Sequence, residues 1–168
     1  MGEKVFAYGS NMCSGRFCAY EVSPQGAGCA ALLSEYRLLF NKKSQKDGSG
    51  KANVEPHPGG QVWGVLYTIP NQDLMTLDAG EGGYYRTTLP VRTIDGGITD
   101  AWVYLASKLS NDPTLRPYAW YKRFLVEGAR EHSILPEYIL ELERIEAVQD
   151  TNQQRDRDKR ALGCGATS

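Results

Sequence analysis

The sequence is poor in the residues that build metal sites. It has two histidines among 168 residues, and its four cysteines, at positions 13, 18, 29 and 164, form no Cys-x-x-Cys pair. Zinc sites use three or four such ligands at short, regular spacing. The pattern therefore argues against a zinc site, and we expect no bound metal.

Motifs of several enzyme classes are also missing. The chain has no Gly-x-Ser-x-Gly elbow, no dinucleotide-binding glycine fingerprint and no phosphate-loop lysine. With two histidines, neither in a recognisable setting, a Ser-His-Asp triad is not expected. The formal net charge of −1 provides no electrostatic reason to expect a nucleic-acid or membrane partner, and no apolar run approaches the ~18 residues of a membrane span.

An export signal is absent from the first residues, which lead directly into an expected strand. We therefore expect a cytoplasmic location. For the same reason we expect free thiols in place of disulfides, with Cys13 and Cys18 packing as small apolar groups.

The composition is that of one globular domain. The hydrophobic share is 41% and the charged share 23%, both ordinary values. From residue 149 onward the chain becomes polar and highly charged. We expect a single domain over residues 1–148 and a disordered tail over 149–168.

Hydrophobic periodicity and turn residues divide the chain into alternating elements. Polar residues 42–51 are expected to form a mobile, solvated loop, and the two prolines and two glycines of 56–60 a turn. We expect strands over 5–8, 27–33, 36–41, 52–55, 61–69, 84–93 and 98–106, and helices over 14–21, 71–79, 118–132 and 136–148.

The rest of the chain is organised around the stretch from Val5 to Met12. Val5, Phe6 and Tyr8 favour a buried strand, whereas the following Gly9-Ser10-Asn11 favours a tight turn. Backbone N–H groups at such a strand end can bind a carboxylate or phosphate. An ordinary strand-to-helix connection is the alternative, and the stretch alone does not decide between them.

Glu81 is the one acidic residue in a setting that favours exposure to a cavity. It lies between Gly80 and the pair Gly82-Gly83, which hold it on a bent, sterically open backbone. A flexible turn is the simpler interpretation of the same residues.

Several motifs, spread from residue 5 to about residue 145, together resemble the gamma-glutamylcyclotransferase family, which is also known as AIG2-like. They occur in the family's order, and the first is the most specific. The motifs are Tyr8-Gly9-Ser10-Asn11-Met12, Val62-Trp63-Gly64-Val65, Leu77-Asp78 with Glu81-Gly82, Tyr85, Tyr121-Lys122 and Gly128-Ala129-Arg130-Glu131.

The resemblance implies a mixed α/β (α+β) fold, a small and mostly closed β-barrel flanked by helices. It implies an enzyme that cyclises a γ-glutamyl compound to 5-oxoproline and releases the amine, without a cofactor. Glu81 matches the family's catalytic glutamate. The substrate-binding matches are Tyr8, Gly9, Ser10, Asn11, Met12, Tyr85 and Tyr121.

This activity suits the residues, because one carboxylate can move the proton and backbone N–H groups can bind the anion. The substrate stays open among γ-glutamyl amino acids of glutathione turnover, γ-glutamylamines and γ-glutamyl groups on specialised metabolites. A non-catalytic ligand-binding module and a hydrolase using water through Glu81 are the alternatives. A monomer and a homodimer both fit the sequence.

Overall fold

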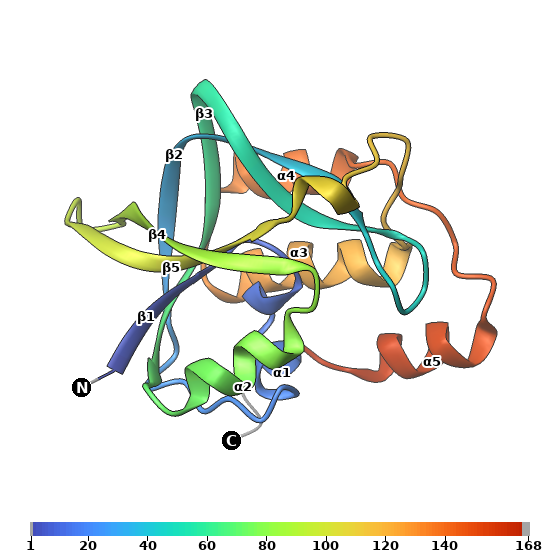
Figure 1. The fold of residues 1–168 in the computed structure, drawn as a ribbon, viewed down its shortest axis with the longest axis horizontal. Helices are drawn as coiled ribbons and strands as arrows, with labels where there is room; N and C mark the ends of the chain where they lie inside the picture. Colours follow the sequence, from blue (N-terminus) through green and yellow to red (C-terminus); the bar gives the residue numbers. More distant parts are fainter. Residues whose placement is uncertain (1, 166–168) are drawn as a thin grey trace.

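A closed five-stranded β-barrel forms the centre of the protein (Figure 1). The structure is a computed structural model and describes residues 2–165. The order around the barrel is β1-β3-β2-β4-β5, with antiparallel neighbours except for β1 and β5, which run parallel. The strands are β1 Gly2–Ala7, β2 Cys29–Lys43, β3 Gly50–Pro70, β4 Tyr84–Thr93 and β5 Ile98–Ala106. The barrel predicted by the resemblance is confirmed.

Strands β2 and β3 form one long hairpin, and here the sequence-based prediction was wrong. The turn expected at 56–60 lies inside β3, opposite a register shift between Ser34 and Tyr36 in β2. Glu35 and Gly59 both have left-handed backbone, with φ of 66° and 74°, and the Gly59 N–H donates to the Glu35 carboxylate at 2.9 Å. The prolines and glycines therefore bend a continuous strand at a β-bulge without ending it.

Helices flank the barrel (Figure 1). They are α1 Ser14–Cys18, α2 Asp73–Gly80, α3 Ala119–Glu131, α4 Pro136–Arg144 and α5 Gln153–Ala161, with 3₁₀ turns η1 Ser10–Met12 and η2 Lys108–Ser110. Helix α3 packs directly against the loop after β1, and this close approach is possible because Gly128 has no side chain. A Cβ atom there would stand 2.5 Å from the backbone of Met12 and Cys13.

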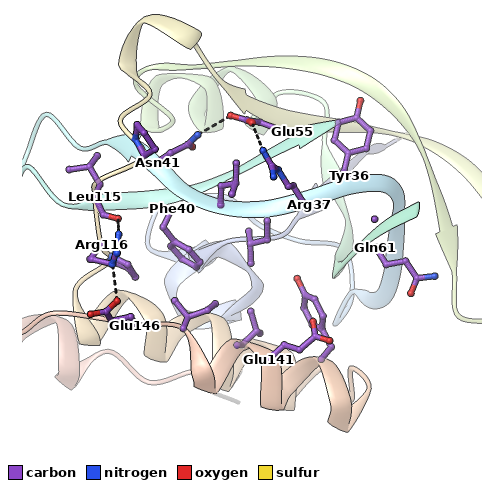
Figure 2. Close-up of a pocket in the computed structure, with 18 residues that line it drawn as sticks. Tyr36, Arg37, Phe40, Asn41, Glu55, Gln61, Leu115, Arg116, Glu141 and Glu146 are labelled. Carbon is purple, nitrogen blue, oxygen red and sulfur yellow. Dashed lines mark hydrogen bonds and ion pairs between the residues drawn. The ribbon is translucent and has the colours of Figure 1, made fainter. Parts of the chain in front are cut away.

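A large cavity lies between the β2–β3 hairpin and α4, with a volume of about 850 Å³ (Figure 2). Leu38, Phe40 and Leu142 are among its apolar walls. Two ion pairs lie at its edge, Arg37–Glu55 at 3.7 Å and Arg116–Glu146 at 3.1 Å. Its charged groups are thus largely engaged with one another.

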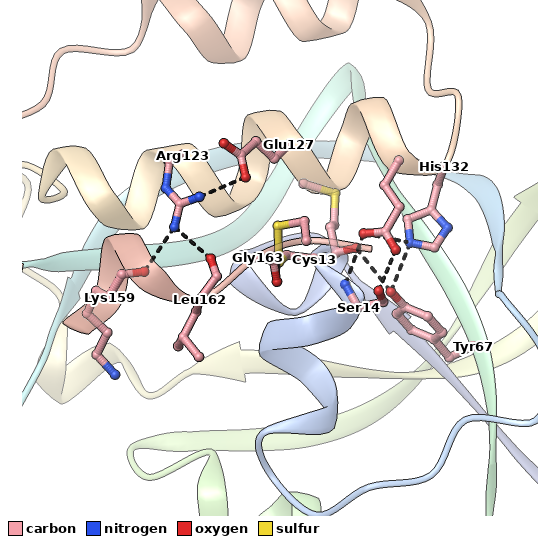
Figure 3. Close-up of a disulfide and its surroundings, with 12 residues drawn as sticks. Cys13, Ser14, Tyr67, Arg123, Glu127, His132, Lys159, Leu162 and Gly163 are labelled. Atoms are coloured by element: carbon pink, nitrogen blue, oxygen red, sulfur yellow. Dashed lines mark hydrogen bonds and ion pairs between the residues drawn. A yellow bond between two sulfur atoms is a disulfide. The ribbon is translucent and has the colours of Figure 1, made fainter. Parts of the chain in front are cut away.

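The expected disordered tail is wrong for its described part, because residues 153–161 form α5 and pack on the domain. Arg123 of α3 donates to the carbonyl oxygens of Lys159 and Leu162, both at 2.9 Å (Figure 3). Trp120 donates to Asp150 at 2.9 Å, and Arg155 pairs with the same carboxylate at 2.6 Å. Composition suggested disorder because the segment is rich in charged residues. The contacts that hold it, with α3 and within the segment itself, become visible only in the folded structure. Residues 166–168 lie outside the described part of the chain.

A disulfide joins Cys13 to Cys164 across 151 positions (Figure 3). The expectation of free thiols is therefore wrong for this pair and holds for Cys18 and Cys29, which are free. The expected apolar packing of Cys18 is wrong, because this residue is exposed. The spacing of the cysteines in the sequence contained no signal for this bond, because α5 must first return along α3. Within residues 2–165, no helix is long and apolar enough to cross a membrane.

We predict that Cys164→Ser lowers the free energy of unfolding by about 2–4 kcal/mol, because a disulfide constrains the unfolded chain. Urea denaturation of the oxidised wild type and the variant measures the difference. Cys29→Ser, which removes an exposed free thiol, is the matched control and should leave stability unchanged. Equal stability of Cys164→Ser and oxidised wild type would contradict the prediction.

Candidate active site

The loop after β1 presents unpaired backbone N–H groups beside the barrel. Within residues 2–165, no hydrogen bond is donated by the backbone N–H of Ser10 or Asn11, whereas the Met12 N–H donates to Gly9 O at 3.1 Å. Gly9 has a φ of −110°, so its role is not the positive φ expected of a turn. A side chain at Gly9 would instead stand 3.1 Å from Ala52 and 3.2 Å from the Tyr121 hydroxyl.

The loop is held from behind by groups on β3 and α3. Tyr67 donates its hydroxyl proton to the Met12 carbonyl oxygen at 3.0 Å. Both the backbone N–H and the hydroxyl of Ser14 donate to the Glu131 carboxylate. These bonds, together with the close approach at Gly128, hold the loop in one place.

Glu81 follows the last turn of α2, and its backbone N–H donates to Leu77 O at 3.0 Å. Gly80 lies against the Tyr20 ring, where a Cβ atom would come within 2.4 Å of the ring. Gly83 has a φ of +85°, which glycine adopts at little cost. The expected bent backbone around Glu81 is confirmed.

The Glu81 carboxylate meets the loop through one short hydrogen bond. Asn11 Nδ2 donates to Glu81 Oε1 at 2.6 Å. Burial raises the pKa of Glu81, while the Asn11 hydrogen bond and then the charges of Arg16 and Lys42 act in the opposite direction. A carboxyl group whose pKa is raised toward neutrality can both accept and return a proton.

Four tyrosines surround this carboxylate. Tyr8 donates to the Tyr104 carbonyl oxygen, Tyr84 to Ala52 O at 2.7 Å, and Tyr104 to Asp78 at 2.7 Å. The Tyr121 hydroxyl accepts the backbone N–H of Ala52 at 3.1 Å. Burial raises the pKa of Tyr121 to about 12 and those of Tyr8, Tyr84 and Tyr104 well above the ordinary value. All four therefore remain neutral at physiological pH.

Two adjoining cavities meet at Glu81. The inner cavity, about 50 Å³, is lined by the loop, Glu81 and all four tyrosines. The outer cavity, about 190 Å³, shares Ser10, Glu81, Tyr84 and Tyr121 with it. Within residues 2–165, no group of three His, Cys, Asp or Glu side chains could hold a metal ion.

Most of the predicted site residues come together in the inner cavity, namely Tyr8, Gly9, Ser10, Asn11, Glu81 and Tyr121. Met12 does not line it, because its side chain is fully buried in the core. Tyr85 does not line either cavity and is 55% exposed. Its neighbour Tyr84, which the sequence reading missed, takes that place, since successive side chains of a strand point to opposite faces.

The comparisons with known proteins point to a single family. A sequence profile of the AIG2-like family matches residues 61–142. Human gamma-glutamylcyclotransferase is 32% identical over 150 residues, which cover 84% of this chain and 77% of that protein. The mouse protein of the same name is 30% identical over 149 residues, with the same coverage. A solved structure of a gamma-glutamyl cyclotransferase superposes with a TM-score of 0.83 at 26% identity, covering 94% of this chain and 97% of the other.

We predict that Asn11→Leu raises the pKa of Glu81 further, because the lost hydrogen bond favours the charged carboxylate. The measurement is an NMR titration of the Glu81 side-chain carboxyl carbon in both proteins. Asn71→Leu, at an exposed position, is the control and should leave the titration unchanged. A pKa that is unchanged or lower in Asn11→Leu would show that the Asn11 hydrogen bond does not stabilise the ionised form.

Proposed function

The chain belongs to the gamma-glutamylcyclotransferase family, and on that premise we propose that it is an enzyme converting a γ-glutamyl compound to 5-oxoproline with release of the amine. One observation carries the proposal. A partly buried carboxylate, Glu81, lies in hydrogen-bond contact with a loop that presents two unpaired backbone N–H groups. In the proposed reaction Glu81 is the proton acceptor and this loop binds the anion.

The reaction needs only proton transfer and positioning. Glu81 takes a proton from the substrate's α-amine, whose nitrogen then attacks the γ-carbonyl carbon of the same molecule and closes a five-membered ring. The bond from that carbon to the leaving nitrogen breaks, and Glu81 returns the proton to that nitrogen. The carboxylate is thereby regenerated, and no covalent enzyme intermediate forms.

The anion-binding loop supplies the positioning. The N–H groups of Ser10 and Asn11 bind the α-carboxylate or the developing oxyanion. Because nucleophile and electrophile belong to one molecule, holding the curled conformer removes much of the barrier, an effect that reaches effective molarities of about 10⁵ M or more. The neutral tyrosines around the inner cavity add hydrogen-bonding groups without adding charge.

The proposed reaction is compatible with γ-glutamyl amino acids, with γ-glutamylamines and with γ-glutamyl groups on specialised metabolites. A role in glutathione turnover belongs to the first of these. The cytoplasmic location stays a prediction that fractionation would test, and the Cys13–Cys164 disulfide is unusual for most cytosolic proteins.

We predict that Glu81→Gln lowers turnover by about 10²–10⁴-fold, because the amide keeps the size of the side chain and cannot accept the proton. The assay measures 5-oxoproline released from γ-glutamyl-alanine and related compounds. Glu137→Gln, an exposed position on α4, is the matched control and should keep wild-type turnover.

The same assay separates this reaction from its alternatives. If Glu81→Gln kept more than about a tenth of the wild-type rate, the role of Glu81 as general acid and base would be wrong. Release of glutamate in place of 5-oxoproline would identify a hydrolase. Absence of both products with folded protein would favour a binding module.

Ser10 is predicted to form no acyl adduct during turnover. Ser10 lines both cavities together with Tyr121, and within the described part of the chain no histidine lies in these cavities to activate its hydroxyl. Mass spectrometry of the protein quenched in the presence of substrate tests this. A γ-glutamyl adduct mapped to Ser10 would overturn the direct cyclisation.

A further inference from the structure

The outer cavity beside Glu81 has strongly basic walls. Arg16, Lys42, Lys46 and Lys51 line it, and Glu81 is its one acidic residue among those described. The whole chain, by contrast, carries 19 basic and 20 acidic residues. Positive charge is therefore concentrated at this cavity by the fold.

Three of these cations have no carboxylate partner among the described residues. Lys51 pairs with Asp47 at 2.9 Å, so its charge is matched. Arg16 donates to the Tyr20 hydroxyl at 2.9 Å and lies over that ring. Lys42 donates to the Gly82 carbonyl oxygen at 2.7 Å and lies over the Tyr84 ring. Within residues 2–165, the Lys46 side chain has no hydrogen-bond or ion-pair partner.

Lys42 is the most informative of the three because it is only 5% exposed. A buried ammonium group is costly unless an anion or several acceptors lie nearby. Gly82 O and the Tyr84 ring satisfy part of that need, and no carboxylate among the described residues forms an ion pair with Lys42. The sequence analysis expected this lysine in a mobile solvated loop, whereas it lies in strand β2, next to the last residue of the strand, and lines the cavity.

The position of the outer cavity relates it to the leaving group of the substrate. This step rests on the proposed function. The inner cavity, with the loop N–H groups and Glu81, receives the γ-glutamyl part that becomes 5-oxoproline. The outer cavity meets it at Glu81, where the leaving nitrogen must receive its proton. The group attached to that nitrogen therefore extends into the basic cavity.

We propose that the outer cavity is a subsite for a leaving group carrying two carboxylates, so that the protein prefers γ-glutamyl dipeptides with an acidic second residue. Glu81 offsets one of the three charges of Arg16, Lys42 and Lys46, and a single α-carboxylate offsets a second. A second carboxylate on the same residue meets the third. Leaving groups with a free amine, such as diamines or a lysine side chain, are repelled by the same three cations.

The test compares kcat/KM for γ-glutamyl-glutamate and γ-glutamyl-glutamine, which have nearly the same shape and differ by one charge. We expect a preference of about tenfold or more for the acidic dipeptide, the size of one charge-assisted hydrogen bond. The preference should decrease as salt is raised, since part of the cavity is open to solvent. Equal values for the two dipeptides, with 5-oxoproline released from both, would overturn the subsite and leave the proposed function intact.

Substitutions assign the preference to this cavity. Lys46→Glu changes an exposed position and should lower the ratio of the two kcat/KM values to near one. Lys43→Glu is the matched control, because Lys43 is exposed and does not line the cavity. A ratio that falls equally in both variants would show a general effect of net charge and contradict a local subsite.

Binding to the Glu81→Gln variant separates the two proposals. Calorimetric titration with both dipeptides should show about tenfold tighter binding of γ-glutamyl-glutamate. If the variant shows that preference in binding and the wild-type protein releases no 5-oxoproline, the subsite is supported and the proposed reaction is overturned. Equal binding of the two dipeptides would overturn the subsite whatever the turnover.

Discussion

The hydrogen bond from Asn11 to Glu81 connects the two halves of the candidate site. The residues lie seventy positions apart, one after the first strand and the other at the end of α2. A carboxylate in a partly buried cavity needs such a donor, since burial alone raises its pKa. The bond also leaves the backbone N–H groups of the loop free for a ligand. Positioning the loop therefore positions the proton acceptor.

The loop depends in turn on what packs behind it. Gly128 lets α3 reach the backbone of Met12 and Cys13, and the Tyr67 hydroxyl donates a hydrogen bond to the Met12 carbonyl oxygen. Cys13, the next residue, is bonded to Cys164 at the end of the C-terminal segment. The segment that composition alone presented as a tail thus contacts the same loop. Core packing and the disulfide therefore both act on Met12 and Cys13, whose side chains contact no substrate in the proposed reaction.

Charge distinguishes the inner and outer parts of the site. The inner cavity combines neutral tyrosines with one carboxylate, which suits proton transfer within a small substrate. The outer cavity combines that carboxylate with four cations, of which Asp47 neutralises one. In the proposed reaction the first determines the chemistry and the second selects the leaving group. The two properties can therefore be altered separately by substitution.

The sequence by itself determined the pattern of strands 84–93 and 98–106, the helix near 118–132, and the glycine-framed Glu81, because local periodicity and backbone freedom decide these. Its motifs also indicated the barrel and most residues of the inner cavity. Only the tertiary structure decided that Tyr84 and not Tyr85 faces the cavity, since strand register is a matter of pairing. The tertiary structure also decided four further features: the continuous bend of β3, the packing of α5, the Cys13–Cys164 bond and the burial of Lys42. Each of these depends on partners distant in the chain, and local composition contains no information about which distant residues meet.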